Sequence, residues 1–162
     1  MKLQPSVFLL AYLLAAPALS ADQTINFTGD WLGTGQLTGT GGGMSGKCTK
    51  IRIKIEHQVH ASPQTLLVKL YDATCGLLAP DWGPYQFEIR SEKVFADNEE
   101  VGTLQGNLFK TMLPGGGAQY AFNMRLVTAD RPSEEVLRSY YCARNLVGAI
   151  VIEGDLKRSS SE

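Results

Sequence analysis

The sequence is poor in histidine and has no excess of basic residues. Its 162 residues include two histidines, and 15 lysines and arginines stand against 16 aspartates and glutamates. A nucleic-acid binder needs a basic face to neutralise phosphates, so we expect no nucleic-acid partner. His57 and His60 lie at the end of a predicted hairpin, where strand residues three apart point to opposite faces. We therefore predict exposed turn histidines and no metal site.

Long apolar runs are missing after the first 20 residues. The apolar run from Val7 to Ala16 follows Lys2 and precedes small residues, which is the layout of a secretory signal peptide. It is shorter than the ~20 residues that a membrane-spanning helix needs. We expect residues 1–20 to be a signal peptide, 21–158 a single domain and 159–162 a disordered tail. The protein is thus predicted to be exported to the periplasm or the extracellular space, with no membrane span.

Catalytic motifs are missing as well. The stretch GGGMSGKCT at 41–49 approaches a phosphate-binding loop, but Cys48 stands where the magnesium-binding hydroxyl is needed. The residues that follow alternate with a period of two, whereas such a loop leads into a helix. No serine or cysteine lies in a nucleophile motif, and the paired glutamates at 99–100 and 134–135 lie in predicted turns. We predict no catalytic residues, no cofactor and no enzymatic activity.

Short alternating runs, by contrast, are abundant. TKIRIKIEHQV, YQFEIR and QYAFNMRLV alternate clearly, and weaker runs cover 27–37, 65–72, 101–110 and 147–157. This spacing predicts an all-β fold, a single antiparallel up-and-down barrel of about eight strands. The residues expected in the barrel interior, or lining a ligand, are Ile53, Ile55, Tyr85, Phe87, Tyr120, Phe122 and Met124.

Residues 133–144 fit two structures. Ser133 could cap a short helix in which Val136, Leu137, Tyr140 and Tyr141 share a face, yet the same residues also alternate. We favour the strand, because it would pair with the run at 147–157.

The three cysteines all lie in the exported part, where disulfides can form. If the strands at 51–59 and 65–72 form a hairpin in which Ile53 faces Leu70 and Ile55 faces Val68, Cys48 lies opposite Cys75. Opposed residues of an antiparallel pair are ~4.5–5.5 Å apart, within disulfide range. We predict the disulfide Cys48–Cys75. Cys142 is then a free, buried thiol, with an intermolecular disulfide as the alternative.

The segment FTGDWLGTGQLTG resembles the opening of calycin-type barrels, the group that includes lipocalins and avidins. The likeness rests on Gly29, Trp31 and the glycines that follow. It implies that Trp31 closes one end of the barrel beneath a basic side chain of the last strand, Arg158 or Lys157. The predicted strand count and the signal peptide agree with this resemblance. Barrels of this size can hold a small apolar ligand at the mouth or on the outer face, which makes a carrier one of the possible functions. The haem-binding histidine of nitrobindin-like members has no counterpart here.

A second likeness extends from residue 29 to about residue 90. The order of Trp31, Cys48, the DATC that ends at Cys75, and the APDWGP that contains Trp82 is similar to that of small periplasmic inhibitors of bacterial metalloproteases. In that family an N-terminal stretch inserts into the protease cleft, which implies that role for residues 21–28. The sequence therefore predicts a non-catalytic binding or interaction module whose partner is a protein or a small apolar ligand. A protease inhibitor and an apolar-ligand carrier are the two alternatives.

Overall fold

The computed structural model describes residues 25–40, 44–115, 117–128 and 134–159, and in these residues it contains strands and no helix. The predicted signal peptide, the glycines at 41–43 and the last three residues lie outside this part. The strands are β1 (Gly29–Gly39), β2 (Ser45–Gln58), β3 (Gln64–Thr74), β4 (Asp81–Trp82), β5 (Tyr85–Arg90), β6 (Lys93–Ala96), β7 (Glu99–Gln105), β8 (Leu108–Gly115), β9 (Ala118–Thr128), β10 (Glu135–Arg144) and β11 (Ala149–Arg158).

The strands form one antiparallel barrel. Neighbours in sequence pair with each other, and β1 closes the ring by pairing with both β2 and β11. Ten strands make the barrel, and β4 is a short additional strand on β3, in the register that β5 continues. The all-β antiparallel barrel is confirmed, but the expected number of strands, about eight, is wrong.

The difference between the predicted and the observed number of strands has identifiable causes. The alternating run at 101–110 predicts one strand, but Gly106, with φ of 53°, and Asn107 form a turn that separates β7 from β8. Strands β4 and β6 have two and four residues, too few to show an alternating pattern. Strand β8 continues beyond the predicted run to Pro114 and Gly115.

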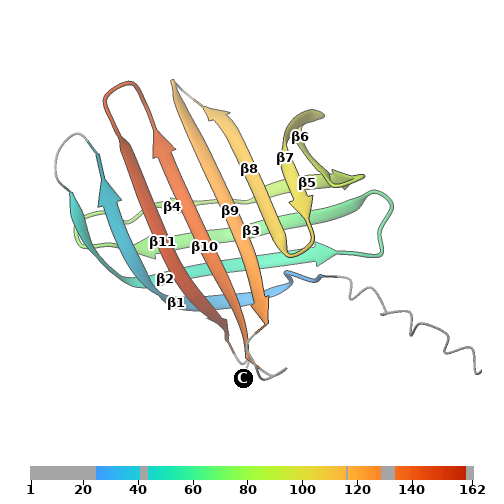
Figure 1. Ribbon diagram of the computed structural model, residues 1–162, viewed down its shortest axis with the longest axis horizontal. Coiled ribbons are helices and arrows are strands. Elements are labelled where there is room, and N and C mark those ends of the chain that lie inside the picture. The colour runs from blue at the N-terminus through green and yellow to red at the C-terminus, as the bar shows by residue number, and fades with distance from the viewer. Residues whose placement is uncertain (1–24, 41–43, 116, 129–133, 160–162) are drawn as a thin grey trace, which may run out of the picture.

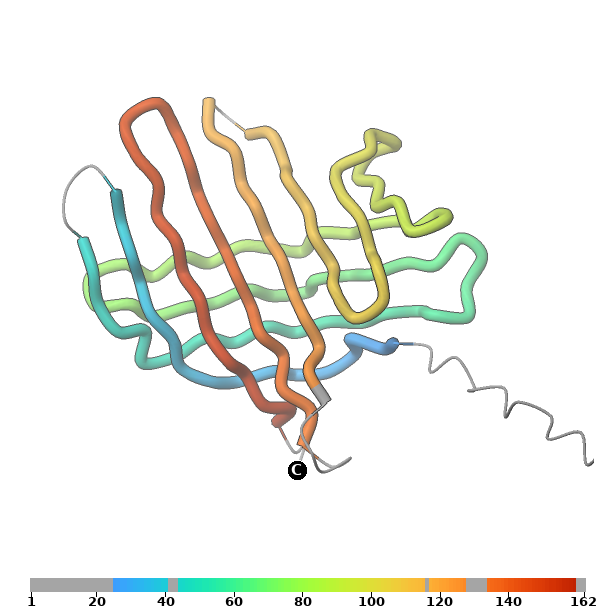
Figure 2. The backbone as a smooth tube through the Cα atoms, viewed as in Figure 1, coloured from blue at the N-terminus to red at the C-terminus, as the bar shows by residue number. Residues whose placement is uncertain are grey.

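The barrel is built of two crossing layers. Figure 1 shows β8, β9, β10 and β11 running across the view in front of β2, β3 and β5. Strand β1 joins the two layers: it pairs with β2 from Gly29 to Thr38 and with β11 from Trp31 to Gly39, and it bends along its length, as the tube in Figure 2 shows. A register shift between Gly33 and Gly35 lies on the path of this bend.

The hairpin of β2 and β3 carries the disulfide. Cys48 and Cys75 are bonded, with an S–S distance of 2.01 Å, as predicted. Ile55 faces Val68 as expected, but Ile53 faces Tyr71 and not Leu70. The difference arises from a register shift between Lys54 and Ile55, a β-bulge that no residue pattern announces.

Residues of the expected strand at 133–144 form β10, from Glu135 onward. This strand pairs with β11 from Val136↔Lys157 to Arg144↔Ala149 and with β9 on its other side. Leu137 and Ser139 are buried while Arg138 between them is exposed, which is the period of a strand. The helical alternative for these residues is therefore wrong, and Ser133 lies outside the described residues.

Large side chains fill the middle of the barrel. Of the expected interior residues, five are buried: Ile53, Ile55, Phe87, Phe122 and Met124. They pack with other fully buried residues such as Ile51 and Phe109 into one core. Tyr120 is half-buried, and Tyr85, expected inside, is 42% exposed because it lies on the inward face where β5 begins, at the edge of the core.

Candidate functional site

One end of the barrel is closed around Trp31. The indole is fully buried, and its Nε1 donates to the carbonyl oxygen of Phe27 at 3.0 Å. The guanidinium of Arg158 lies over the ring, 4.5 Å from its centroid. This is the pairing that the calycin resemblance implies. Lys157, the other basic residue considered, pairs with Leu32 and is exposed.

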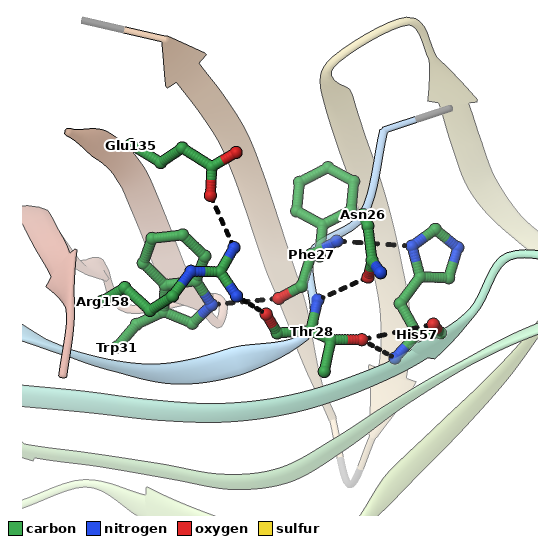
Figure 3. Close-up of polar contacts among 7 residues, drawn as sticks. All are labelled: Asn26, Phe27, Thr28, Trp31, His57, Glu135 and Arg158. Carbon is green, nitrogen blue, oxygen red and sulfur yellow. Dashed lines mark hydrogen bonds and ion pairs between the residues drawn. The ribbon is translucent and has the colours of Figure 1, made fainter. Parts of the chain in front are cut away.

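Arg158 also forms hydrogen bonds with two neighbouring segments at this end of the barrel. It donates to the carboxylate of Glu135 at 2.6 Å and to the carbonyl oxygen of Thr28. Figure 3 shows the guanidinium between these two acceptors, with the Trp31 ring beside it. The side chain of Arg158 thus contacts β10, the segment before β1 and Trp31.

The segment before β1 is the other part of this closure. The Phe27 ring is fully buried, and its backbone N–H donates to Nδ1 of His57 at 3.5 Å. The Thr28 hydroxyl accepts from the backbone N–H of His57 at 2.9 Å and donates to its carbonyl oxygen at 3.2 Å (Figure 3). We refer to residues 25–28, together with Trp31, His57 and Arg158, as the closed end.

His57 is therefore not the exposed turn residue that its position suggested. Its side chain is 5% exposed, whereas His60 is exposed. Burial lowers the pKa of His57, because desolvation disfavours the imidazolium. The neutral ring is also the form that can accept the Phe27 N–H at Nδ1. The sequence pattern missed this role because it depends on a contact between β2 and the segment before β1.

The opposite end of the barrel contains a hollow. Strand β10 starts at Glu135, which binds Arg158 at the closed end, and runs to Tyr141, which lines this hollow. The hollow has a volume of about 460 Å³. Its walls are the inward-facing side chains of Trp82, Tyr85, Leu113, Tyr120, Phe122 and Tyr141, and Pro80, Asp81 and Gly115 complete its edge. We call it the mouth hollow.

The aromatic rings of the mouth hollow form a continuous cluster. Trp82 lies nearly perpendicular to Phe122 and to Tyr85, with ring centroids 4.9 and 5.3 Å apart. Behind it, Tyr71 stacks on the indole, with centroids 5.1 Å apart and an angle of 12° between the planes. Perpendicular and stacked contacts hold such rings in fixed orientations. The walls are therefore already in place in the structure.

Two polar atoms of this cluster have no hydrogen-bond partner in the described part of the chain: the Nε1 of Trp82 and the hydroxyl of Tyr71. A buried polar group without a partner costs about 1–3 kcal/mol. Burial raises the pKa of the Tyr71 hydroxyl, and also that of Tyr141. Both phenols are therefore neutral donors at physiological pH.

The structure divides the expected interior residues between two places. Tyr85, Tyr120 and Phe122 meet at the mouth hollow, whereas Ile53, Ile55, Phe87 and Met124 belong to the filled core. The alternating runs do not include Trp82, because it lies in the two-residue strand β4. Sequence reasoning missed Tyr141, because the segment around it fitted both helix and strand.

A larger depression, of about 520 Å³, lies on the outer face of the barrel. Exposed side chains line it, among them Arg138 and Asp155, which pair with each other at 2.8 Å. Charged side chains that are already paired and solvated gain little from a ligand. The mouth hollow, with its aromatic walls, is the better candidate for binding.

Nowhere in the described ranges do three histidine, cysteine, aspartate or glutamate side chains gather to hold a metal ion. Cys142 is a free and buried thiol on the side of β10 that carries Arg138 and Tyr140. No helix long and apolar enough to cross a membrane is found among the described residues.

Two comparisons with known proteins gave no match. No family model matches this chain, and no curated protein sequence matches it.

Proposed function

We propose that this protein is a non-catalytic, exported binding protein that holds a small, largely apolar ligand in the mouth hollow. The observation that carries the proposal is the aromatic lining: five aromatic residues from four strands converge on one hollow of about 460 Å³, namely Trp82, Tyr85, Tyr120, Phe122 and Tyr141. Ligand sites in proteins have volumes of about 300–1,000 Å³ and mostly apolar walls.

The hydrogen-bonding groups near the hollow support the same proposal. A binding site combines apolar walls with a few polar groups that orient the ligand. Tyr120 and Tyr141, each with a hydroxyl, are among the lining residues, and the Nε1 of Trp82, which has no partner among the described residues, belongs to a ring that lines the hollow. A ligand with a polar end could therefore be oriented as well as enclosed.

The closed end supports the carrier over the protease inhibitor. An inhibitor of the kind considered would insert residues 21–28 into a protease cleft. Phe27 is fully buried in the barrel, and Thr28 is bonded to His57. Releasing this segment would break those contacts and uncover Trp31. The Trp31–Arg158 stack is in keeping with membership of the calycin-type group, which is part of the proposal.

The proposed location rests on the leader and on the disulfide. Residues 1–20 have the layout of a secretory signal peptide, and Cys48 and Cys75 are bonded. Disulfides persist in the periplasm and outside the cell and are rare in the cytosol. We therefore propose a periplasmic or extracellular protein.

The first test is a native mass spectrum of the mature protein, purified without denaturation from its own secretory compartment. A carrier is expected to retain a small molecule that is lost on denaturation. The second test is titration with the neutral fluorescent probe N-phenyl-1-naphthylamine. We expect saturable binding accompanied by quenching of Trp82, measured in a Trp31→Phe background that leaves Trp82 as the single tryptophan.

Matched variants locate the site. Tyr85→Ala removes a wall of the hollow and is expected to weaken probe binding, whereas Tyr140→Ala on the outer face of β10 is expected to leave it unchanged. Absence of saturable probe binding, or equal effects of the two variants, would overturn the proposal.

A further inference from the structure

Two tight turns at the mouth of the barrel present apolar side chains to the solvent. Leu77 lies in the turn between β3 and β4, and Leu146 and Val147 lie in the turn between β10 and β11. The exposed fractions of the two leucines are 104% and 103%, and that of Val147 is 85%. These three side chains therefore make almost no contact with the barrel.

Hydrogen bonds fix the backbone of both turns. In the first turn, the backbone N–H of Cys75 donates to the carbonyl oxygen of Leu78 at 2.8 Å, and the disulfide joins Cys75 to β2. In the second, the side-chain oxygen of Asn145 accepts from the backbone N–H groups of Val147 and Gly148 at 2.9 and 3.0 Å. The backbone of each turn thus holds its apolar tip away from the barrel.

Other two-residue turns of this barrel have polar tips. The tip between β5 and β6 is Ser91–Glu92, that between β6 and β7 is Asp97–Asn98, and that between β7 and β8 is Gly106–Asn107. Glycine and short polar residues are the usual residues of such turns, because they tolerate positive φ or bond to their own backbone. Leucine and valine serve neither purpose, so the turns at the mouth carry them for another reason.

The apolar tips lie at one end of the barrel, where β1 also ends. The backbone N–H of Thr40 donates to the carbonyl oxygen of Ala149 at 2.9 Å, which joins the β1–β2 connection to the start of β11. Met44, which is 46% exposed, lines one depression with Val147 and with Tyr120, a residue of the mouth hollow. In Figure 1 the turns after β3 and after β10 both lie at the left of the view. We use the name apolar rim for Met44, Leu77, Leu146 and Val147.

The connections that carry the apolar rim are uncharged. The segments 40–44, 75–80 and 145–148 contain no lysine, arginine, aspartate or glutamate. Exposed charges begin in the flanking strands, with Lys47, Arg144 and Asp81, which faces Asp72 in the ladder of β3 and β4. Because these charges are of both signs, a surface that the rim contacts is bound by apolar burial and not by charge.

We infer that the apolar rim docks on the surface of a lipid bilayer, so that the mouth of the barrel faces the membrane. A stable protein interface buries about 800 Å² on each partner. Side chains on separate turns expose only on the order of a few hundred Å². A bilayer requires no complementary pockets, and binding to it increases with the apolar area inserted. Tyrosine and tryptophan, which line the mouth hollow behind the rim, are frequent at the membrane–water interface.

Partition of the mature full-length protein into vesicles of phosphatidylcholine tests this inference. We expect the wild type to float with the vesicles and to stay bound in about 0.5 M sodium chloride, which screens charges. Leu77→Ser and Leu146→Ser are each expected to lower the partition coefficient about fivefold, because each removes apolar surface that the bilayer would bury. Leu32→Ser is the matched control and is expected to have no effect. Leu32 is also an exposed leucine, at 45%, but it follows Trp31 at the closed end.

The two tryptophans report the orientation of the bound protein. Trp82 lines the mouth hollow, whereas Trp31 is buried at the closed end. Phosphatidylcholine with a spin label on its headgroup is expected to quench Trp82 in the Trp31→Phe variant. It should leave Trp31 unquenched in the Trp82→Phe variant.

Failure of the wild type to bind the vesicles would overturn the inference. Equal losses for Leu32→Ser and Leu146→Ser, or stronger quenching of Trp31 than of Trp82, would overturn it as well. A dimer that dissociates on Leu146→Ser, without vesicle binding, would assign the apolar rim to a second copy of the chain and contradict docking on a bilayer. The inference does not depend on a ligand in the mouth hollow. Saturable binding of N-phenyl-1-naphthylamine without vesicle binding therefore supports the proposed function and refutes the docking alone.

Discussion

Gly35 of β1 and Gly154 of β11 face each other in the ladder and leave room for the side chain of Ile51. A Cβ atom on Gly35 would lie 2.0 Å from the carbonyl oxygen of Glu153 and 2.6 Å from Cδ1 of Ile51. A Cβ atom on Gly154 would lie 2.6 Å from the same methyl group. The two glycines thus allow β1 to approach β11 closely next to its register shift.

Substitution of Gly35 by alanine is expected to destabilise the barrel. Relief of the overlap with the Glu153 backbone requires β1 and β11 to move apart, and overpacking of this kind costs about 1–3 kcal/mol. Gly46→Ala in β2 is the control, because no atom lies within 4 Å of the added Cβ. The measurement is the free energy of unfolding in urea. Equal values for the two variants would show that the close approach is not required.

Alternation was sufficient to predict the fold class but not the strand count. Runs such as TKIRIKIEHQV place a core residue at every second position, and they became long strands. The turn of Gly106 and Asn107 did carry a local signal, since Gly-Asn between two strands is typical of a tight hairpin. Strand β4 carries none, because two residues acquire their pairing only from β3.

The candidate site was predictable only in part, for the same reason. Tyr85, Tyr120 and Phe122 were assigned to the interior face by alternation within their own strands. The place of Trp82 depends on β4 continuing the register of β5 along β3, as Tyr71↔Trp82 and Val68↔Tyr85 show. The opposition of Asp81 and Asp72 follows from that same register. Such relationships between distant segments leave no local pattern in the sequence.

Removal of the disulfide is expected to lower the stability of the barrel strongly. The bond joins residues separated by 27 positions, and the loop-entropy relation gives about 3–4 kcal/mol for a loop of that length. Cys48→Ala combined with Cys75→Ala is compared with the wild type in urea. Cys142→Ala, which leaves the bond intact, is the control for loss of a cysteine. A double variant as stable as the control would mean that the packing of β2 on β3 suffices.

The accessibility of the thiols checks the assignment of Cys142. It is 7% exposed, so a thiol reagent is expected to label it slowly in the folded protein and fully in denaturant. Mass spectrometry should find one labelled cysteine after unfolding without a reductant and three after reduction. Two or more labels without reduction would contradict the Cys48–Cys75 bond.

Arg158 is expected to stabilise the closed end by more than its charge alone. Arg158→Ala removes the stack on Trp31 and leaves Glu135 and the Thr28 carbonyl without their donor. We expect a loss of about 1–2 kcal/mol in the free energy of unfolding. Arg158→Lys is expected to lie between this variant and the wild type, because lysine keeps the charge but not the planar group.

Arg138→Ala is the matched control for Arg158, because it removes an arginine from an exposed pair with Asp155 that does not stack on a ring. Its effect is expected to be small. The fluorescence of Trp31, recorded in a Trp82→Phe background, should shift to the red for Arg158→Ala and not for Arg138→Ala. Equal losses in stability would mean that the stack on Trp31 contributes nothing.

The stability of the barrel is expected to fall as the pH drops below about 6.5, the ordinary pKa of histidine. In the folded protein burial lowers the pKa of His57, so between that lowered pKa and 6.5 the unfolded chain binds a proton and the folded one does not. The contribution of neutral His57 to the free energy of unfolding is therefore fully present above pH 6.5. It decreases as the pH falls toward the pKa of His57 in the folded protein, with a slope of at most about 1.4 kcal/mol per pH unit.

Loss of the closed end is the structural counterpart of that decrease. A proton on Nδ1 of His57 removes the acceptor for the Phe27 N–H and places a charge beside a buried ring. His57→Asn offers an oxygen near the place of Nδ1 and cannot titrate, so the unfolding free energy of this variant is expected to lose most of its pH dependence. His60→Asn, which changes an exposed histidine, should retain the dependence of the wild type. If His57→Asn keeps the full pH dependence, other groups determine how the free energy of unfolding changes with pH. Protonation of His57 at its contact with Phe27 is then not the cause.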